Sequence, residues 1–110
     1  STNWERMLEL YDLLLREKRT SVVILNRAIV LSQLGRTTEA ISEIMAIENI
    51  GELLEQHYIY NAVLGDLYIK TGDLVIARTY LARAHTLTTS SAEKNLIGSK
   101  LRSVDMVTKN

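Results

Sequence analysis

The chain has 110 residues, and its 13 basic and 13 acidic side chains give a formal net charge of zero. Nucleic-acid-binding domains and polybasic membrane anchors both need an excess of positive charge, so both classes are disfavoured. The absence of cysteine excludes a disulfide framework and thiolate chemistry, and is compatible with a reducing cytoplasm. Proline and phenylalanine are also absent and aliphatic residues dominate, which favours helices, and the length suits one domain over residues 1–110. No apolar run approaches the ~20 residues of a membrane span, so we expect none.

The first half of the chain predicts three helices, over residues 3–17, 20–34 and 37–47, because apolar residues recur there at helical spacing. The second of these is apolar nearly all round, which indicates a buried helix, and Gly35 ends it. The candidate capping residues are Asn3, Thr20 or Ser21, and Thr37 or Thr38. The residues of the third helix that we expect to face inward are Ala40, Ile41, Ile44, Met45 and Ile47.

The second half predicts three more helices, after a break at Asn49, Ile50 and Gly51. The first of them runs from about Glu52 to Lys70, and the next runs from its cap at Asp73 to about Leu87. Ser90 and Glu93 stand at capping-box spacing, so a last helix begins there. Its apolar stripe consists of Leu96, Ile97, Leu101, Val104 and Val107. About six helices are therefore expected.

A pattern of small and apolar residues occurs twice, with an offset of 37 residues between Gly35 and Gly72. The clearer copy consists of Gly65, Tyr68, Gly72, Ala77, Leu81 and Ala84. The looser copy consists of Ala28, Leu31, Gly35, Ala40, Ile44 and Ile47. This spacing resembles a tetratricopeptide repeat, whose usual period is about 34 residues. The resemblance implies an all-α fold, a right-handed stack of helix hairpins that offers a surface to protein partners.

In such repeats the first helix of each hairpin lines a concave groove. The positions that the repeat register places there are Val22, Leu25, Ile29, Ser32, Gln33, Ile59, Ala62, Asp66, Ile69 and Lys70. We predict that the aliphatic members Val22, Leu25, Ile29 and Ile69 make the contact, while Asp66 and Lys70 orient it. An exposed aliphatic groove favours aggregation, so something should cover it. Two covers stay open: the first or last helix of this domain, or a partner helix or domain.

Catalytic and metal-binding patterns are not found. His57 and His85 are 28 residues apart and lack the spacings of known metal motifs. Glutamate pairs such as Glu5 and Glu9 lie on solvated helix faces, and no glycine-rich phosphate loop occurs. We therefore assign no catalytic, cofactor-binding or metal-binding residue, and we expect the chain not to be an enzyme.

A more specific resemblance begins at Leu10, Tyr11 and Asp12 and continues through residues 22–30. Its later matches are Tyr58, Leu67, Gly72, Ala77, Tyr80, Arg83, Ala84, Leu87 and Glu93. Together these residues resemble the C-terminal tetratricopeptide-like domain of bacterial extracytoplasmic-function (ECF) RNA polymerase sigma factors. The chain departs from that family where residues 19–21 and Arg36 replace prolines. Asn26 and Arg27 are the most specific match, and we favour hydrogen bonds inside the stack over a partner contact for them.

The resemblance implies a cytoplasmic regulatory domain without catalytic activity, and the missing initial methionine suggests a fragment of a longer protein. Its implied partners are the sigma regions of the same protein, RNA polymerase or a regulator, while promoter DNA is bound by the parent and not by this region. The alternative is a free-standing adaptor that binds a peptide or helix of an unrelated protein. Homodimerisation through the outer helices is also left open.

Overall fold

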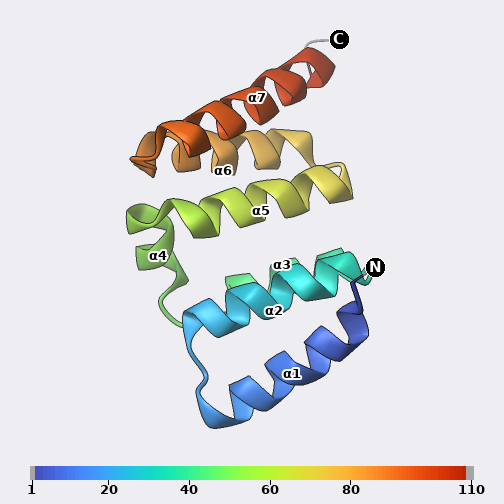
Figure 1. Ribbon diagram of the computed structural model, residues 1–110. Helices are drawn as coiled ribbons and strands as arrows, with labels where there is room; N and C mark the ends of the chain where they lie inside the picture. The colour runs from blue at the N-terminus through green and yellow to red at the C-terminus, as the bar shows by residue number, and fades with distance from the viewer. Residues whose placement is uncertain (1, 109–110) are drawn as a thin grey trace. The chain divides into compact units, whose positions relative to one another are not determined.

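The computed structural model describes residues 2–108, and these residues form seven α-helices and no strand (Figure 1). The predicted all-α class is confirmed. The chain divides into two compact units, of which the first ends at Ile50 and the second begins at Gly51. Within the described residues, no helix is both long and apolar enough to cross a membrane.

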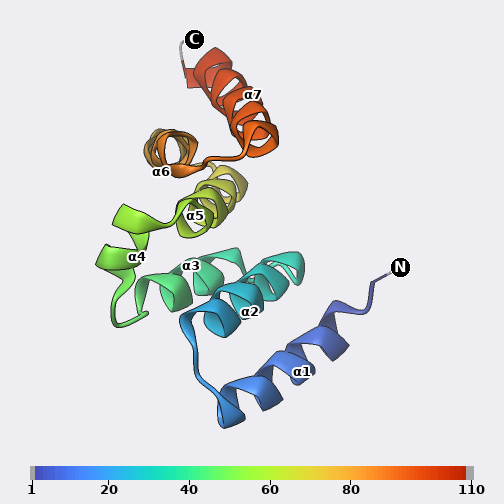
Figure 2. The ribbon, with the colours of Figure 1, turned by 60° about the vertical axis from the view of Figure 1, so that its left-hand side comes forward.

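The first unit contains α1 (Trp4–Glu17), α2 (Ser21–Gln33) and α3 (Thr37–Met45). The side chain of Asn3 caps α1 by accepting a hydrogen bond from the backbone N–H of Arg6. Thr20 caps α2 in the same way, through the N–H of Val23. Helix α2 packs against both α1 and α3, which lie on different sides of it in Figure 2. The predicted bounds of α1 and α2 agree with the structure within one residue. The predicted cap of α3 at Thr37 or Thr38 is wrong, since Arg36 is its N-cap, and α3 ends at Met45, before the predicted helical residue Ile47.

The second unit contains α4 (Ile50–Gln56) apart from its first residue, followed by α5 (Tyr58–Thr71), α6 (Leu74–Leu87) and α7 (Ser91–Thr108). The predicted single helix from Glu52 to Lys70 is wrong, because His57 takes an extended conformation between α4 and α5. The fully buried Asn61 stabilises this break, since its Nδ2 donates to the carbonyls of Leu54 and His57 at 2.9 and 3.1 Å. The predicted break after the third helix is present but lies earlier than predicted, at residues 46–49 and not at 49–51, because α4 already begins at Ile50.

The two copies of the repeat, which are offset by 37 residues, end their first helices in the same way. Gly35 and Gly72 have φ angles of +80° and +83°, which glycine adopts without steric cost. The N–H of the residue after each glycine donates to a carbonyl five residues earlier, from Arg36 to Leu31 and from Asp73 to Tyr68. These four residues keep the same offset of 37, so the repeat seen in the sequence produces a repeated helix–turn–helix hairpin.

The close approach of α5 to α6 depends on Gly65. A Cβ atom at Gly65 would lie 2.6 Å from Cδ2 of Leu81, closer than two carbon atoms can pack. Ala77 and Ala84 are fully buried on the same helix as Leu81. Beside them, the rings of Tyr68 and Tyr80 stack with their centroids 5.7 Å apart. One inward prediction is wrong: Met45, in the last turn of α3, is exposed.

Candidate protein-interaction surface

The predicted groove residues of the first unit lie on α2 and differ widely in exposure. Val22 is 56% exposed, Ile29 is half-buried, and Leu25 is only 4% exposed. Gln33 is exposed, whereas Ser32 is buried and its hydroxyl lies 3.3 Å from that of Thr37. Val22 is therefore the predicted contact residue that a partner reaches most easily on this helix, while Leu25 belongs to the core.

Arg27 ties the three helices of the first unit together. Its Nε donates to Asp12 on α1 and its Nη1 donates to Glu43 on α3, each at 2.7 Å. Burial lowers the pKa of Arg27, but the hydrogen bonds to Glu43 and Asp12 outweigh it, so the pKa lies above its ordinary value. Arg27 thus makes the hydrogen bonds inside the stack that we favoured from the sequence.

The predicted groove residues of the second unit lie on α5, and α7 partly covers them. Both carboxylate oxygens of Asp66 accept from Nζ of Lys100 on α7, at 2.9 and 3.0 Å. Ile69 packs against the buried cluster of Leu81, Ala84, Ile97 and Val104. Lys70 and Ile59 are exposed, while Ala62 packs on the same cluster. In this unit α7 therefore contacts Asp66 and the cluster on which Ile69 packs, while Ile59 and Lys70 stay exposed.

The six predicted contact residues thus divide between the units, with three on α2 and three on α5. Their part in binding a partner stays a prediction. Within the second unit a small apolar pocket of about 260 Å³ remains between α7 and the ends of α5 and α6, lined among others by Ile69, Leu74 and Val107.

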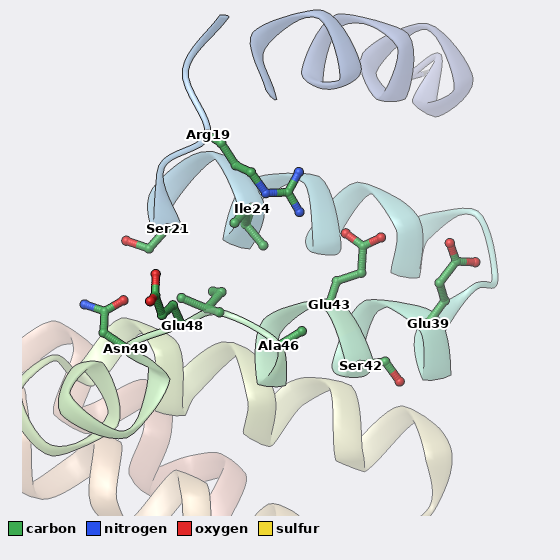
Figure 3. A pocket seen from close by; sticks show the side chains of 10 residues that line it. Arg19, Ser21, Ile24, Glu39, Ser42, Glu43, Ala46, Glu48 and Asn49 are labelled. Atoms are coloured by element: carbon green, nitrogen blue, oxygen red, sulfur yellow. The ribbon is translucent and has the colours of Figure 1, made fainter. Parts of the chain in front are cut away.

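A polar pocket of about 560 Å³ in the first unit was not predicted (Figure 3). It lies between the α1–α2 turn at Arg19 and the end of α3, two segments that only the tertiary fold brings together. Two of its three glutamates are already paired, Glu43 with Arg27 and Glu39 with Arg36. The hydrogen bond from Arg36 holds the pKa of Glu39 below its ordinary value. The pocket lining contains no histidine or cysteine that could act as a nucleophile or base.

The described residues contain no group of three or more histidine, cysteine, aspartate or glutamate side chains placed to hold a metal ion. His57 is exposed and its ring lies 6.4 Å from that of Tyr60, while His85 is half-buried. The non-enzymatic character of the chain remains an expectation from the sequence.

Helix α1 also carries an exposed apolar face that was not predicted. Leu10, Leu13 and Leu14 are each about half exposed, and they border a shallow hollow of about 670 Å³. Apolar residues at helical spacing predicted this helix, but they were not divided between its faces, so the leucines on the side away from α2 were not recognised as exposed. Plotting α1 as a helical wheel, with each leucine assigned to one face, would have found this second stripe.

An uncharacterized protein of Rhizobium meliloti (strain 1021) is 33% identical over 100 residues, which cover 91% of this chain. The same match covers 23% of the relative, so the chain spans about a quarter of that protein's length. No protein-family model matches the chain, and no solved structure matches it.

Proposed function

We propose that this chain is a non-catalytic regulatory domain of an ECF-type RNA polymerase sigma factor, located in the cytoplasm and built of tetratricopeptide-like hairpins. The domain contacts the sigma regions of its own protein, RNA polymerase or a regulator, and so modulates transcription initiation. Regulation requires that it binds two states of the parent protein with different affinity.

The observation that carries this proposal is the repeated hairpin, closed at Gly35 and at Gly72 by the same pair of backbone hydrogen bonds. Repeated helical hairpins are typical of scaffolds that bind other proteins. The resemblance to the sigma-factor domain then selects the partner. Arg27, its most specific match, joins α1, α2 and α3, so the resemblance includes residues that hold the first unit together.

The gene sequence upstream of the coding region for this chain provides the first test. We expect it to encode the promoter-binding and polymerase-binding sigma regions in the same reading frame. A reading frame that encodes a different domain there overturns the sigma-factor proposal and favours the alternative, an adaptor that binds a peptide or helix of an unrelated protein.

Transcription in vitro with the full-length protein and core RNA polymerase provides the second test. The substitution Val22→Asp should reduce promoter-specific transcript, since Val22 is exposed and its replacement should not disturb the core. Val75→Asp is the matched control, because Val75 is an equally apolar and more exposed residue on α6. Equal transcript from both variants and the wild type would contradict a role for the α2 surface.

A further inference from the structure

Helix α1 presents apolar side chains on two opposite faces. The face toward α2 carries half-buried residues, namely Trp4, Met7, Leu8, Tyr11 and Leu15. The opposite face carries Leu10 and Leu13, which are 50% and 54% exposed, with Leu14 at its border. None of the residues of α1 is fully buried. A helix at the edge of its unit, as α1 is in Figure 2, does not need a second apolar face to pack on α2 alone.

The exposed face has the spacing of a helix-pairing seam. Arg6, Leu10, Leu13 and Glu17 follow one another at intervals of four, three and four residues, which places them in one stripe along the helix. The two leucines occupy the centre of the stripe, and opposite charges occupy its two ends. Among the described residues, the side chains of Arg6 and Glu17 make no ion pair with another side chain.

We propose that this stripe binds a second copy of the chain through an antiparallel pair of α1 helices. In that arrangement a two-fold axis passes between Tyr11 and Asp12, so Leu10 lies opposite Leu13 of the other copy and Arg6 lies opposite its Glu17. The stripe is therefore complementary to itself in both shape and charge, as a two-fold interface requires. A parallel pair would place Arg6 against Arg6 and Glu17 against Glu17, which is repulsive.

The size of the stripe sets the strength of the contact. One pair of 14-residue helices buries less than the ~1,200–2,000 Å² of a standard stable interface. We therefore expect a dissociation constant on the order of tens of micromolar, with a weak rise at higher salt as the end charges are screened.

Sedimentation equilibrium of the 110-residue chain tests the surface. The wild type should dimerise, and Leu13→Lys should raise the dissociation constant by at least about thirtyfold, because it replaces two central leucines per dimer. Leu96→Lys is the matched control, since Leu96 is similarly exposed but lies on α7, and it should change the constant by less than about threefold. A wild type that stays monomeric at about 1 mM overturns the proposal, and so does a dimer unaffected by Leu13→Lys.

Exchanging the charges of Arg6 and Glu17 tests the antiparallel orientation of the two α1 helices. Arg6→Glu should weaken the dimer by about tenfold, because each end then pairs two acids. Adding Glu17→Arg to the same chain should restore the dissociation constant to within about threefold, since every Arg–Glu pair is rebuilt in reverse. Both changes suit the helix dipole, so circular dichroism should show unchanged helix content. Failure of the double variant to recover overturns the antiparallel arrangement.

Discussion

At the residue scale, Gly65 sets how closely α5 and α6 approach. We predict that Gly65→Ala lowers the free energy of unfolding by about 1–3 kcal/mol, because the new methyl group would overlap Leu81 in a filled core. This loss opposes the gain of ~1 kcal/mol that alanine brings to a helix interior. Chemical denaturation followed by circular dichroism measures the difference.

Gly98→Ala is the control for this substitution, because Gly98 also lies inside a helix but has room beside it. The nearest atom to a Cβ at Gly98 is Nη1 of Arg102, at 3.5 Å. The same change should therefore stabilise the chain there by up to ~1 kcal/mol. If both variants gained stability, Gly65 would not be the residue that limits the approach of α5 and α6.

Tyr68 should make stability depend on alkaline pH. Burial raises the pKa of Tyr68 above its ordinary value of 10.0, and Tyr80 and Asp73 raise it further. The folded chain therefore holds this proton more tightly than the unfolded chain, so the contribution is complete below pH 10 and is lost as pH rises through the folded pKa. Tyr68→Phe should flatten the fall of the unfolding free energy above pH 10. At pH 7 residue 68 is uncharged in both the wild type and Tyr68→Phe. The difference between their unfolding free energies at that pH therefore reports packing alone and serves as the reference.

At the element scale, the break between α4 and α5 depends on Asn61. Asn61→Ala removes two hydrogen bonds and leaves the carbonyls of Leu54 and His57 without this donor, which should cost about 2–3 kcal/mol. In hydrogen-exchange measurements, Asn61→Ala should speed the exchange of the α4 amides, relative to the wild type, more than that of the α6 amides. Asn95→Ala is the control, because Asn95 is exposed on α7 and its loss should stay within about 0.5 kcal/mol. Unchanged exchange in α4 would contradict this role of Asn61.

Asn61 also explains why the break between α4 and α5 was not predicted. Caps at Asn3, Thr20 and Ser90 were predicted because each bonds a backbone N–H three residues along the chain. The end of α4 was not predicted, because no glycine or proline marks His57 and the residues around it continue the helical pattern. Its hydrogen bonds come from a side chain that is buried only once the second unit has folded.

At the scale of the whole molecule, the second unit has a core made of its own residues. Leu81, Ala84, Ile97 and Val104 form a buried cluster, and α5 and α7 are also joined through Asp66 and Lys100. We predict that residues 51–110, expressed alone, keep a helical spectrum and a cooperative thermal transition at a lower temperature than the whole chain. A domain of about 60 residues is only marginally stable, so the loss should be evident.

Leu81→Ala in that fragment is the control. Leu81 is 1% exposed, and truncating a buried leucine costs about 2–5 kcal/mol, which exceeds the stability expected of so small a domain. The variant should unfold at 25 °C. If the unsubstituted fragment of residues 51–110 showed no cooperative thermal transition, the second unit would depend on the first for its folding.

Local sequence was enough to predict the all-α class, the caps at Asn3, Thr20 and Ser90, and the repeated hairpin, because these depend on residues within one or two helical turns of each other or on a fixed offset. The tertiary structure decided which predicted contact residues a partner can reach. Leu25 and Val22 look equivalent as aliphatic residues three positions apart, yet one is buried and the other exposed. Likewise Asp66 meets Lys100 across 34 residues of chain. Exposure and ion pairing depend on which helices pack together, and local sequence does not encode that choice.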